Sequence, residues 1–117
     1  MNAGHSRGFV LDSQGVVRHH LERSGPPLGI RPDLPYTHSD WTPLEVGDTI
    51  LLVTDGIEET EGPDGTFFEE AGLLDAVRSV GSGAARDAIV AVHDALRRFA
   101  VDQSDDWTLI VAKFVGP

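Results

Sequence analysis

Two aspartates border apolar segments in a way that suggests a metal site built from strand ends. Asp55 follows the apolar segment 50–54, and Asp105 precedes the apolar segment 107–111. A carboxylate at the end of a buried strand is held rigidly, and its hard oxygen atoms suit Mg²⁺ or Mn²⁺. If the two strands lie side by side, Asp55 and Asp105 come together although about fifty residues separate them.

Each segment taken alone also has a plainer interpretation. An Asp-Gly pair such as Asp55-Gly56 commonly forms a turn after a strand. Asp105 and Asp106 would equally suit a solvated cap before a strand. Because neighbouring residues of a strand point to opposite faces, we expect only one of these two carboxylates to face a shared site. Gly56 would allow another segment of backbone to approach Asp55 closely.

Other kinds of chemistry have little support in the sequence. The chain has no cysteine, which excludes thiol catalysis, disulfides and cysteine-ligated metals. Its five histidines match no zinc-ligand spacing, and there is no serine-hydrolase, P-loop or dinucleotide motif. His93 falls on a predicted helix and is interpreted as a surface residue. For His5 two interpretations stay open: it orients a loop near a site, or it is plain loop polarity.

Composition narrows the class of protein and its partners. The 117 residues suffice for one domain or part of one, and 40% are hydrophobic. Nineteen acidic residues against nine basic ones give a net charge of -10, which argues against nucleic acid as the main partner and is compatible with divalent cations. No secretory signal and no apolar run of ~18 residues is present, so we expect a cytoplasmic chain that does not insert into a membrane.

The hydrophobic pattern predicts an α+β fold. A hairpin at the rim of a sheet is expected over residues 8–21, followed by a proline- and glycine-rich loop over 24–35. Strand 49–54 is continuously apolar in its middle and is expected to be central and buried on both faces. The remaining expected elements are a short strand at 36–41, helices at 69–80 and 84–100, and a last strand at 107–115.

Five ordered motifs then point to a family. They span nearly the whole chain and comprise residues 2–5 (Asn-Ala-Gly-His), 25–30, 44–48, 52–59 and 105–111. In this order they resemble SpoIIE-like and RsbU-like bacterial serine/threonine phosphatases, a type 2C-like branch of the metal-dependent protein phosphatase (PPM) family. The resemblance implies a layered α-β-β-α sandwich of mainly antiparallel sheets, with two Mn²⁺ or Mg²⁺ ions at one end.

The resemblance also implies roles for particular residues. Asp55 matches the metal-binding aspartate of the family's T-D-G motif, and Asp105 matches the first, metal-binding aspartate of the D-D/N-x-T/S motif. Asp106 would help to position its loop, with Gly56 and His5 in supporting roles. In such a site two cations activate a water molecule for in-line attack on phosphorus, so no nucleophilic side chain is needed. For phosphate recognition the sequence offers three equal candidates: Arg7, Arg18 and Arg31.

One departure from the family pattern matters. Family domains are roughly twice as long, and their amino-terminal half supplies a further metal-binding aspartate that no segment here replaces. Residues 1–117 are therefore expected to be the carboxy-terminal part of a single phosphatase domain, with an incomplete site and little activity alone. Loss of partner strands would uncover apolar sheet surface, which favours a homodimer.

Two functions follow from the sequence as hypotheses. The first is a phosphatase domain that hydrolyses phosphoserine or phosphothreonine on a regulatory protein, of the anti-sigma-factor antagonist type, in bacterial partner-switching signalling. This pathway is implied by the resemblance only. The alternative is a non-catalytic interaction module that retains half of the phosphatase fold and binds a regulatory protein.

Overall fold

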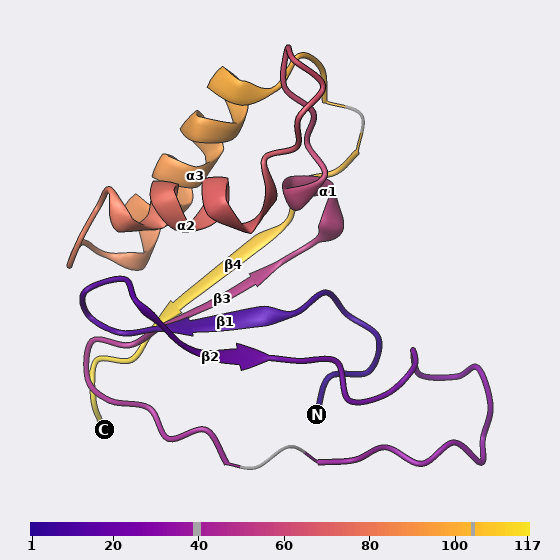
Figure 1. Ribbon diagram of the computed structural model, residues 1–117. Coiled ribbons are helices and arrows are strands. Elements are labelled where there is room, and N and C mark those ends of the chain that lie inside the picture. Colours follow the sequence, from indigo (N-terminus) through magenta and orange to yellow (C-terminus); the bar gives the residue numbers. More distant parts are fainter. Residues whose placement is uncertain (39–40, 104) are drawn as a thin grey trace.

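A computed structural model describes residues 1–38, 41–103 and 105–117, and its centre is a four-stranded antiparallel sheet (Figure 1). The strands are β1 (Gly8–Leu11), β2 (Val17–Leu21), β3 (Thr49–Val53) and β4 (Leu109–Lys113), in the spatial order β2-β1-β3-β4. Helices α1 (Asp55–Glu58), α2 (Glu69–Arg78) and α3 (Ala85–Phe99) lie between β3 and β4 in the chain. The predicted α+β class is confirmed.

The predicted hairpin forms, with a turn stabilised by one side chain. The Asp12 carboxylate accepts hydrogen bonds from the backbone amides of Gln14 at 2.8 Å and Val16 at 2.9 Å. Gly15 completes the turn with a φ of +81°, a conformation that costs glycine little. The hairpin was expected at the rim of the sheet, but of its two strands only β2 lies at an edge, because β1 pairs with β3 on its other side.

The long connection from β2 to β3 contains no strand in its described part. The short strand expected over residues 36–41 is absent at 36–38 and 41, and its other two residues lie outside the described part. Instead this segment is attached locally to the amino terminus, where the Ser24 amide donates to the Asn2 carbonyl at 2.9 Å. In Figure 1 it runs along the side of the sheet opposite the helices.

Strand β3 is central, as predicted, but only one of its faces is fully buried. Leu51 and Val53 are 0% and 1% exposed and contact the helix layer, whereas Ile50 and Leu52 are half-buried. Across the sheet Leu52 lies opposite Ile110 of β4, which is 55% exposed. The expectation of burial on both faces is therefore wrong, because the described residues supply a helix layer on one side of the sheet alone (Figure 1).

Helices α2 and α3 cover the buried face and supply most of the core. The ring of Phe68, just before α2, meets that of Phe99 at the end of α3, with centroids 5.5 Å apart. The amide of Ala84 is capped by the Asp87 carboxylate at 2.9 Å. The core residues of these helices are Leu73, Leu74, Ala76, Val77, Ala88, Val92 and Leu96.

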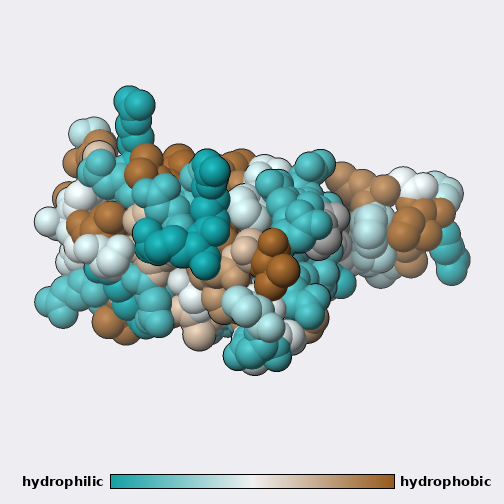
Figure 2. Space-filling model, turned by 90° about the horizontal axis from the view of Figure 1, so that it is seen from above, coloured by the Kyte–Doolittle hydropathy of each residue, from teal (hydrophilic) through white to brown (hydrophobic). Residues whose placement is uncertain are grey.

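The molecule is thin as a result of this architecture. Its principal extents are 44 × 36 × 18 Å, and the smallest corresponds to roughly one sheet and one helix layer of ~10 Å each. The surface in Figure 2 is a mosaic of hydrophilic and hydrophobic residues, and its narrow end is the β2–β3 connection, where Leu28 and Ile30 are exposed. None of the helices in the described residues is long and apolar enough to cross a membrane.

Candidate functional site

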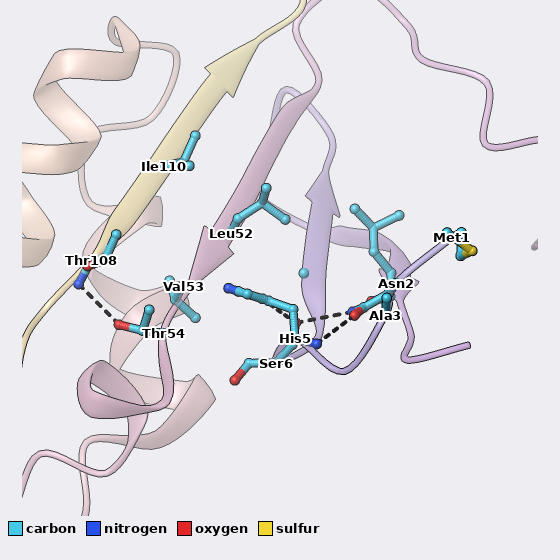
Figure 3. A pocket seen from close by; sticks show the side chains of 12 residues that line it. Met1, Asn2, Ala3, His5, Ser6, Leu52, Val53, Thr54, Thr108 and Ile110 are labelled. Carbon is cyan, nitrogen blue, oxygen red and sulfur yellow. Dashed lines mark hydrogen bonds between the residues drawn. The ribbon is translucent and has the colours of Figure 1, made fainter. Parts of the chain in front are cut away.

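The end of β3 and the beginning of β4 lie side by side. The antiparallel register places Val53 opposite Leu109. Beyond this pair the Thr54 amide donates to the Thr108 carbonyl at 3.1 Å. The Thr108 amide donates to the Thr54 hydroxyl at 3.1 Å, and Figure 3 shows this second bond. The two motif segments are thus joined at one edge of the sheet, which brings the positions of Asp55 and Asp105 into the same neighbourhood.

Gly56 allows the closest approach between these segments. A Cβ atom at this position would lie 2.5 Å from the Asp106 carbonyl oxygen and 3.3 Å from the Asp105 Cβ. The Asp105 side chain therefore packs against the backbone of the residue that follows Asp55. Any other residue at position 56 would force the two segments apart.

The two neighbouring aspartates contribute in different ways. One carboxylate oxygen of Asp105 accepts a hydrogen bond from the Asp106 amide at 2.7 Å, which fixes the orientation of the Asp105 side chain. The Asp106 carbonyl accepts a hydrogen bond from the Thr54 hydroxyl at 3.4 Å. Asp106 thus holds its loop through backbone atoms, and both aspartates are exposed.

Asp55 opens a one-turn helix that the sequence analysis did not predict. Helix α1 spans Asp55–Glu58, and the Glu59 amide donates to the Asp55 carbonyl at 2.8 Å. Buried Gly56 and Ile57 face inward, whereas Asp55 is exposed. The turn therefore presents the Asp55 carboxylate at the surface, next to the start of β4.

The surroundings of α1 are strongly acidic. Burial raises the pKa of Glu58; Arg7 opposes this rise, and the carboxylates of Glu70, Asp55 and Glu59 add to it. A hollow of about 660 Å³ lies beside Glu58, lined by Arg7, Glu58, Glu59, Glu61, Phe67, Glu69 and Glu70. Negative charge on this side of the turn attracts cations.

His5 reaches toward the same strand end from the amino terminus. Its amide donates to the Asn2 side-chain oxygen at 2.9 Å, and its ring Nδ1 lies 2.9 Å from the Ser6 carbonyl. Because a carbonyl only accepts, Nδ1 is the donor in this contact, which orients the ring. The ring projects into a cavity of about 420 Å³, toward Val53 and Thr54 (Figure 3).

The three arginine candidates are all bound to carboxylates. Arg18 pairs with Asp48, which precedes β3 and so lies at the opposite end of this strand from Asp55. Arg31 pairs with Asp33 at 2.7 Å within the long connection. Arg7 lies 3.7 Å from Glu22 and 3.9 Å from Glu70, and among the three it alone lines the hollow beside Glu58.

The residues present fit part of a metal site. Asp55 and Asp105 offer carboxylate oxygens, the donors that Mg²⁺ and Mn²⁺ prefer, at an edge where Gly56 leaves room for a second segment. Within residues 1–38, 41–103 and 105–117, no three histidine, aspartate or glutamate side chains converge to hold an ion. A divalent cation at this edge would thus need further ligands beyond these two.

The sequence matches one known family along almost its entire length. Residues 1–115 match the family described as Stage II sporulation protein E (SpoIIE). The chain belongs to the SpoIIE family. The matched region contains both the Asp55 motif and the Asp105 motif.

Two curated relatives match most of this chain. The SpoIIE-family chain is 33% identical over 113 residues to phosphoserine phosphatase RsbU of Bacillus subtilis, covering 96% of this chain and 33% of RsbU. It is 31% identical over 77 residues to protein IcfG of Synechocystis sp., covering 66% of this chain and 12% of IcfG. The chain thus spans a third or less of the length of these two relatives.

Solved structures share the fold. The SiaA-PP2C domain of Pseudomonas aeruginosa superimposes with a TM-score of 0.77 at 23% identity, covering 96% of this chain and 44% of that one. The RsbU and RsbW domains of Rv1364c from Mycobacterium tuberculosis give a TM-score of 0.64 at 27% identity, covering 93% and 30%. The sheet and helices of this chain therefore form part of a PP2C-type fold.

Sequence reasoning did not single out the residues that join the two motif segments. Thr54 and Thr108 flank the aspartates and were included in the motifs without a role. Thr60 and Trp107 are 47 residues apart and form a direct side-chain hydrogen bond. A threonine near the aspartate of each motif was the signal that could have indicated Thr54 and Thr108. No local pattern marks Thr60 and Trp107 as partners.

Proposed function

We propose that this SpoIIE-family chain is part of a metal-dependent protein phosphatase domain that acts on phosphoserine or phosphothreonine. The observation that carries the proposal is the joining of the Asp55 and Asp105 segments at one sheet edge. The similarity to a phosphoserine phosphatase over 96% of this chain supports the same reaction. Because the chain matches only 33% of that relative, phosphatase activity is a proposal for this chain.

In this proposal Asp55 and Asp105 are ligands of Mn²⁺ or Mg²⁺, two of which are expected in a complete domain. Such ions would supply Lewis acidity toward a phosphoryl group and an activated water molecule. Asp55 is held by the α1 turn, and Asp105 is held by the amide of Asp106. Gly56 keeps the two segments close, and the His5 ring points toward the same strand end (Figure 3).

We further propose that residues 1–117 form the carboxy-terminal part of the phosphatase domain. The match to less than half of the SiaA-PP2C chain supports a partial domain. The remaining ligands would then come from a segment outside the sequence described here. The half-buried side of the sheet, with Leu52 and Ile110, would be covered either by that segment or by a second copy in a homodimer.

The proposed substrate is a phosphorylated regulatory protein of the anti-sigma-factor antagonist type, in bacterial partner-switching signalling in the cytoplasm. One structural neighbour contains an RsbU and an RsbW domain in one polypeptide, and RsbU itself is named a phosphoserine phosphatase. These neighbours support the context of the reaction. The particular partner protein is a matter for direct binding and dephosphorylation assays.

The decisive experiment measures Mn²⁺-dependent release of phosphate from a phosphoserine peptide. We would compare the chain as it stands with a version extended at its amino terminus. We expect turnover from the longer version only, and loss of at least 100-fold of that turnover in Asp55→Asn and Asp105→Asn. Asp102→Asn, an exposed aspartate of the neighbouring loop, is the control and should retain activity. Full activity of both ligand variants would refute the assignment.

A second function has one observation in its favour. The described residues contain no three-ligand metal group. A non-catalytic module that binds a regulatory protein needs no such group. It would bind the unphosphorylated and phosphorylated forms of its partner without Mn²⁺, and an extended version would show no turnover in the same assay.

A further inference from the structure

Thr60 lies where the two motif segments are closest, and its hydroxyl group connects them. The hydroxyl oxygen accepts a hydrogen bond from the indole Nε1 of Trp107 at 3.0 Å and donates one to the carbonyl of Gly56 at 2.8 Å. A hydroxyl group can accept and donate at the same time. The single side chain of Thr60 therefore links the entrance of β4 to the α1 turn.

Both partners of Thr60 adjoin a proposed ligand. Gly56 directly follows Asp55, and Trp107 is the second residue after Asp105. Thr60 itself is only 4% exposed, so water competes little for its two hydrogen bonds. A change in the position of the hydroxyl would move the α1 turn relative to the Asp105 loop.

The indole of Trp107 is held on its other side as well. Its ring meets the imidazole of His93 on α3 edge to face, with centroids 6.3 Å apart, and the side chain packs against the core. Nearby, the Val101 amide donates to the Glu61 carbonyl at 3.1 Å. Helix α3 and the segment after it therefore keep the indole N–H directed at Thr60.

Resting on the proposed function, we propose that Thr60 and Trp107 are positioning residues for the metal-binding edge. Their hydroxyl–indole link fixes how far apart Asp55 and Asp105 are held. Neither residue contacts the cation or the substrate in this proposal. The link deepens the assignment of the site because it gives Trp107 of the motif 105–111 a role and adds Thr60, which no motif includes.

The test uses substitutions that remove or keep the hydroxyl group. Thr60→Val has the same shape without the hydroxyl, and Thr60→Ser keeps it. Thr49→Val is the matched control, since Thr49 is also buried (5% exposed) but starts β3 at the end away from Asp55. Mn²⁺ affinity is measured by isothermal titration of the folded version extended at its amino terminus, because the edge needs further ligands. We expect about a tenfold loss in Thr60→Val, about 1.4 kcal/mol, and less than a twofold change in the other two variants.

A second measurement does not depend on the metal. Trp41 is 98% exposed, so in a Trp41→Phe background Trp107 is the remaining tryptophan and reports on its own surroundings. In metal-free protein, Thr60→Val should increase the quenching of Trp107 fluorescence by acrylamide about twofold, and Thr49→Val should leave it unchanged. If Thr60→Val fails to fold, Trp107→Phe removes the N–H but keeps an aromatic ring and should show the same loss of Mn²⁺ affinity.

The outcomes separate this inference from the proposed function. Unchanged Mn²⁺ affinity together with unchanged quenching in Thr60→Val would overturn the positioning role. Equal loss of affinity in Thr60→Ser and Thr60→Val would also overturn it, because the hydroxyl would then not be the cause. If the wild-type chain and its extended version both bind no Mn²⁺, the metal site fails and so does the positioning role toward it, whatever the quenching shows.

Discussion

The carboxylate of Asp48 is almost completely buried and is paired with the guanidinium of Arg18. The same carboxylate oxygen accepts a hydrogen bond from the Glu45 amide at 2.9 Å. The Phe114 amide donates to the Asp48 carbonyl at 2.9 Å. Asp48 thus ties together the hairpin, the segment before β3 and the residue after β4, at the end of the sheet away from Asp55.

This pairing predicts a specific pH dependence. Burial alone would raise the pKa of Asp48, but the Glu45 amide and Arg18 together hold it below its ordinary value of 3.8. A lowered folded pKa means that the charged form stabilises the protein above the ordinary pKa. That stability is lost as the pH falls from about 4 through the folded pKa.

Asp48→Asn should therefore lower the free energy of unfolding at neutral pH by about 1–3 kcal/mol, because Arg18 loses its charged partner. Urea denaturation as a function of pH measures this, and the variant should lose less stability than wild type between pH 4 and pH 2. Asp102→Asn serves as the exposed control. Parallel pH curves for wild type and Asp48→Asn would show that Asp48 carries no such stabilisation.

Gly56→Ala tests the close approach at the site. The new Cβ would lie 2.5 Å from the Asp106 carbonyl oxygen, so backbone must shift. We expect destabilisation of about 1–3 kcal/mol, with weaker Mn²⁺ binding because Asp105 moves. Gly83→Ala, whose nearest contacts would be at 3.1 Å, should cost less. Thermal unfolding and titration calorimetry give both quantities, and wild-type values in Gly56→Ala would contradict the described packing.

Thr54→Val tests the bond between the two strand ends. The Thr108 amide would lose its side-chain acceptor, which should cost about 0.5–1.5 kcal/mol. Thr54→Ser retains the hydroxyl and should lie close to wild type. Hydrogen exchange of the Thr108 amide reports on the bond directly, and faster exchange is expected in Thr54→Val alone. Equal exchange in the two variants would mean that the hydroxyl does not protect this amide.

Ile110→Lys tests the proposed self-association. Ile110 is 55% exposed and lies opposite Leu52 on the side of the sheet away from the helices. A charge there should shift the chain toward monomer by light scattering at micromolar concentration. Val115→Lys is the control, because Val115 is 84% exposed and follows β4. A monomeric wild-type chain, or association that persists in Ile110→Lys, would argue against a dimer through this face.

The sequence pattern predicted the two longer helices and the hairpin, whose formation depends on residues that are close in sequence. The apolar stripe of α3 and the acidic start of α2 indicated helices within one or two residues of Ala85–Phe99 and Glu69–Arg78. The hairpin followed from the turn at Asp12 to Gly15. These signals were sufficient because helix periodicity and turn chemistry depend on residues close in sequence.

Tertiary contacts account for the differences. The expected last strand 107–115 is shorter, Leu109–Lys113: before it the Trp107 side chain bonds to Thr60, and after it the Phe114 amide bonds to the Asp48 carbonyl. The Asp55-Gly56 pair, for which a turn was one interpretation, instead begins helix α1. The open side of β3 was read as buried because an apolar run does not specify what covers it.

In the candidate site, too, some features could be predicted from the sequence and others depend on tertiary contacts. The adjacency of the Asp55 and Asp105 segments was predicted from strand-end motifs, whereas the metal-ligand roles stay predictions. The Thr60–Trp107 contact bridges two distant segments and was not accessible from the sequence. Residues that position others are chosen by the geometry of the folded chain, so a spacing pattern does not reveal them.

The strand order has a consequence for the order of folding events. Strands β1 and β2 are neighbours in sequence, but pairing of β3 with β4 closes a loop that contains all three helices. Closing a longer loop costs more entropy and slows folding. We therefore expect the edge with Asp55 and Asp105 to assemble after the hairpin and after α2 has packed on α3. During synthesis, the proposed ligands Asp55 and Asp105 would therefore come together only once β4 has left the ribosome.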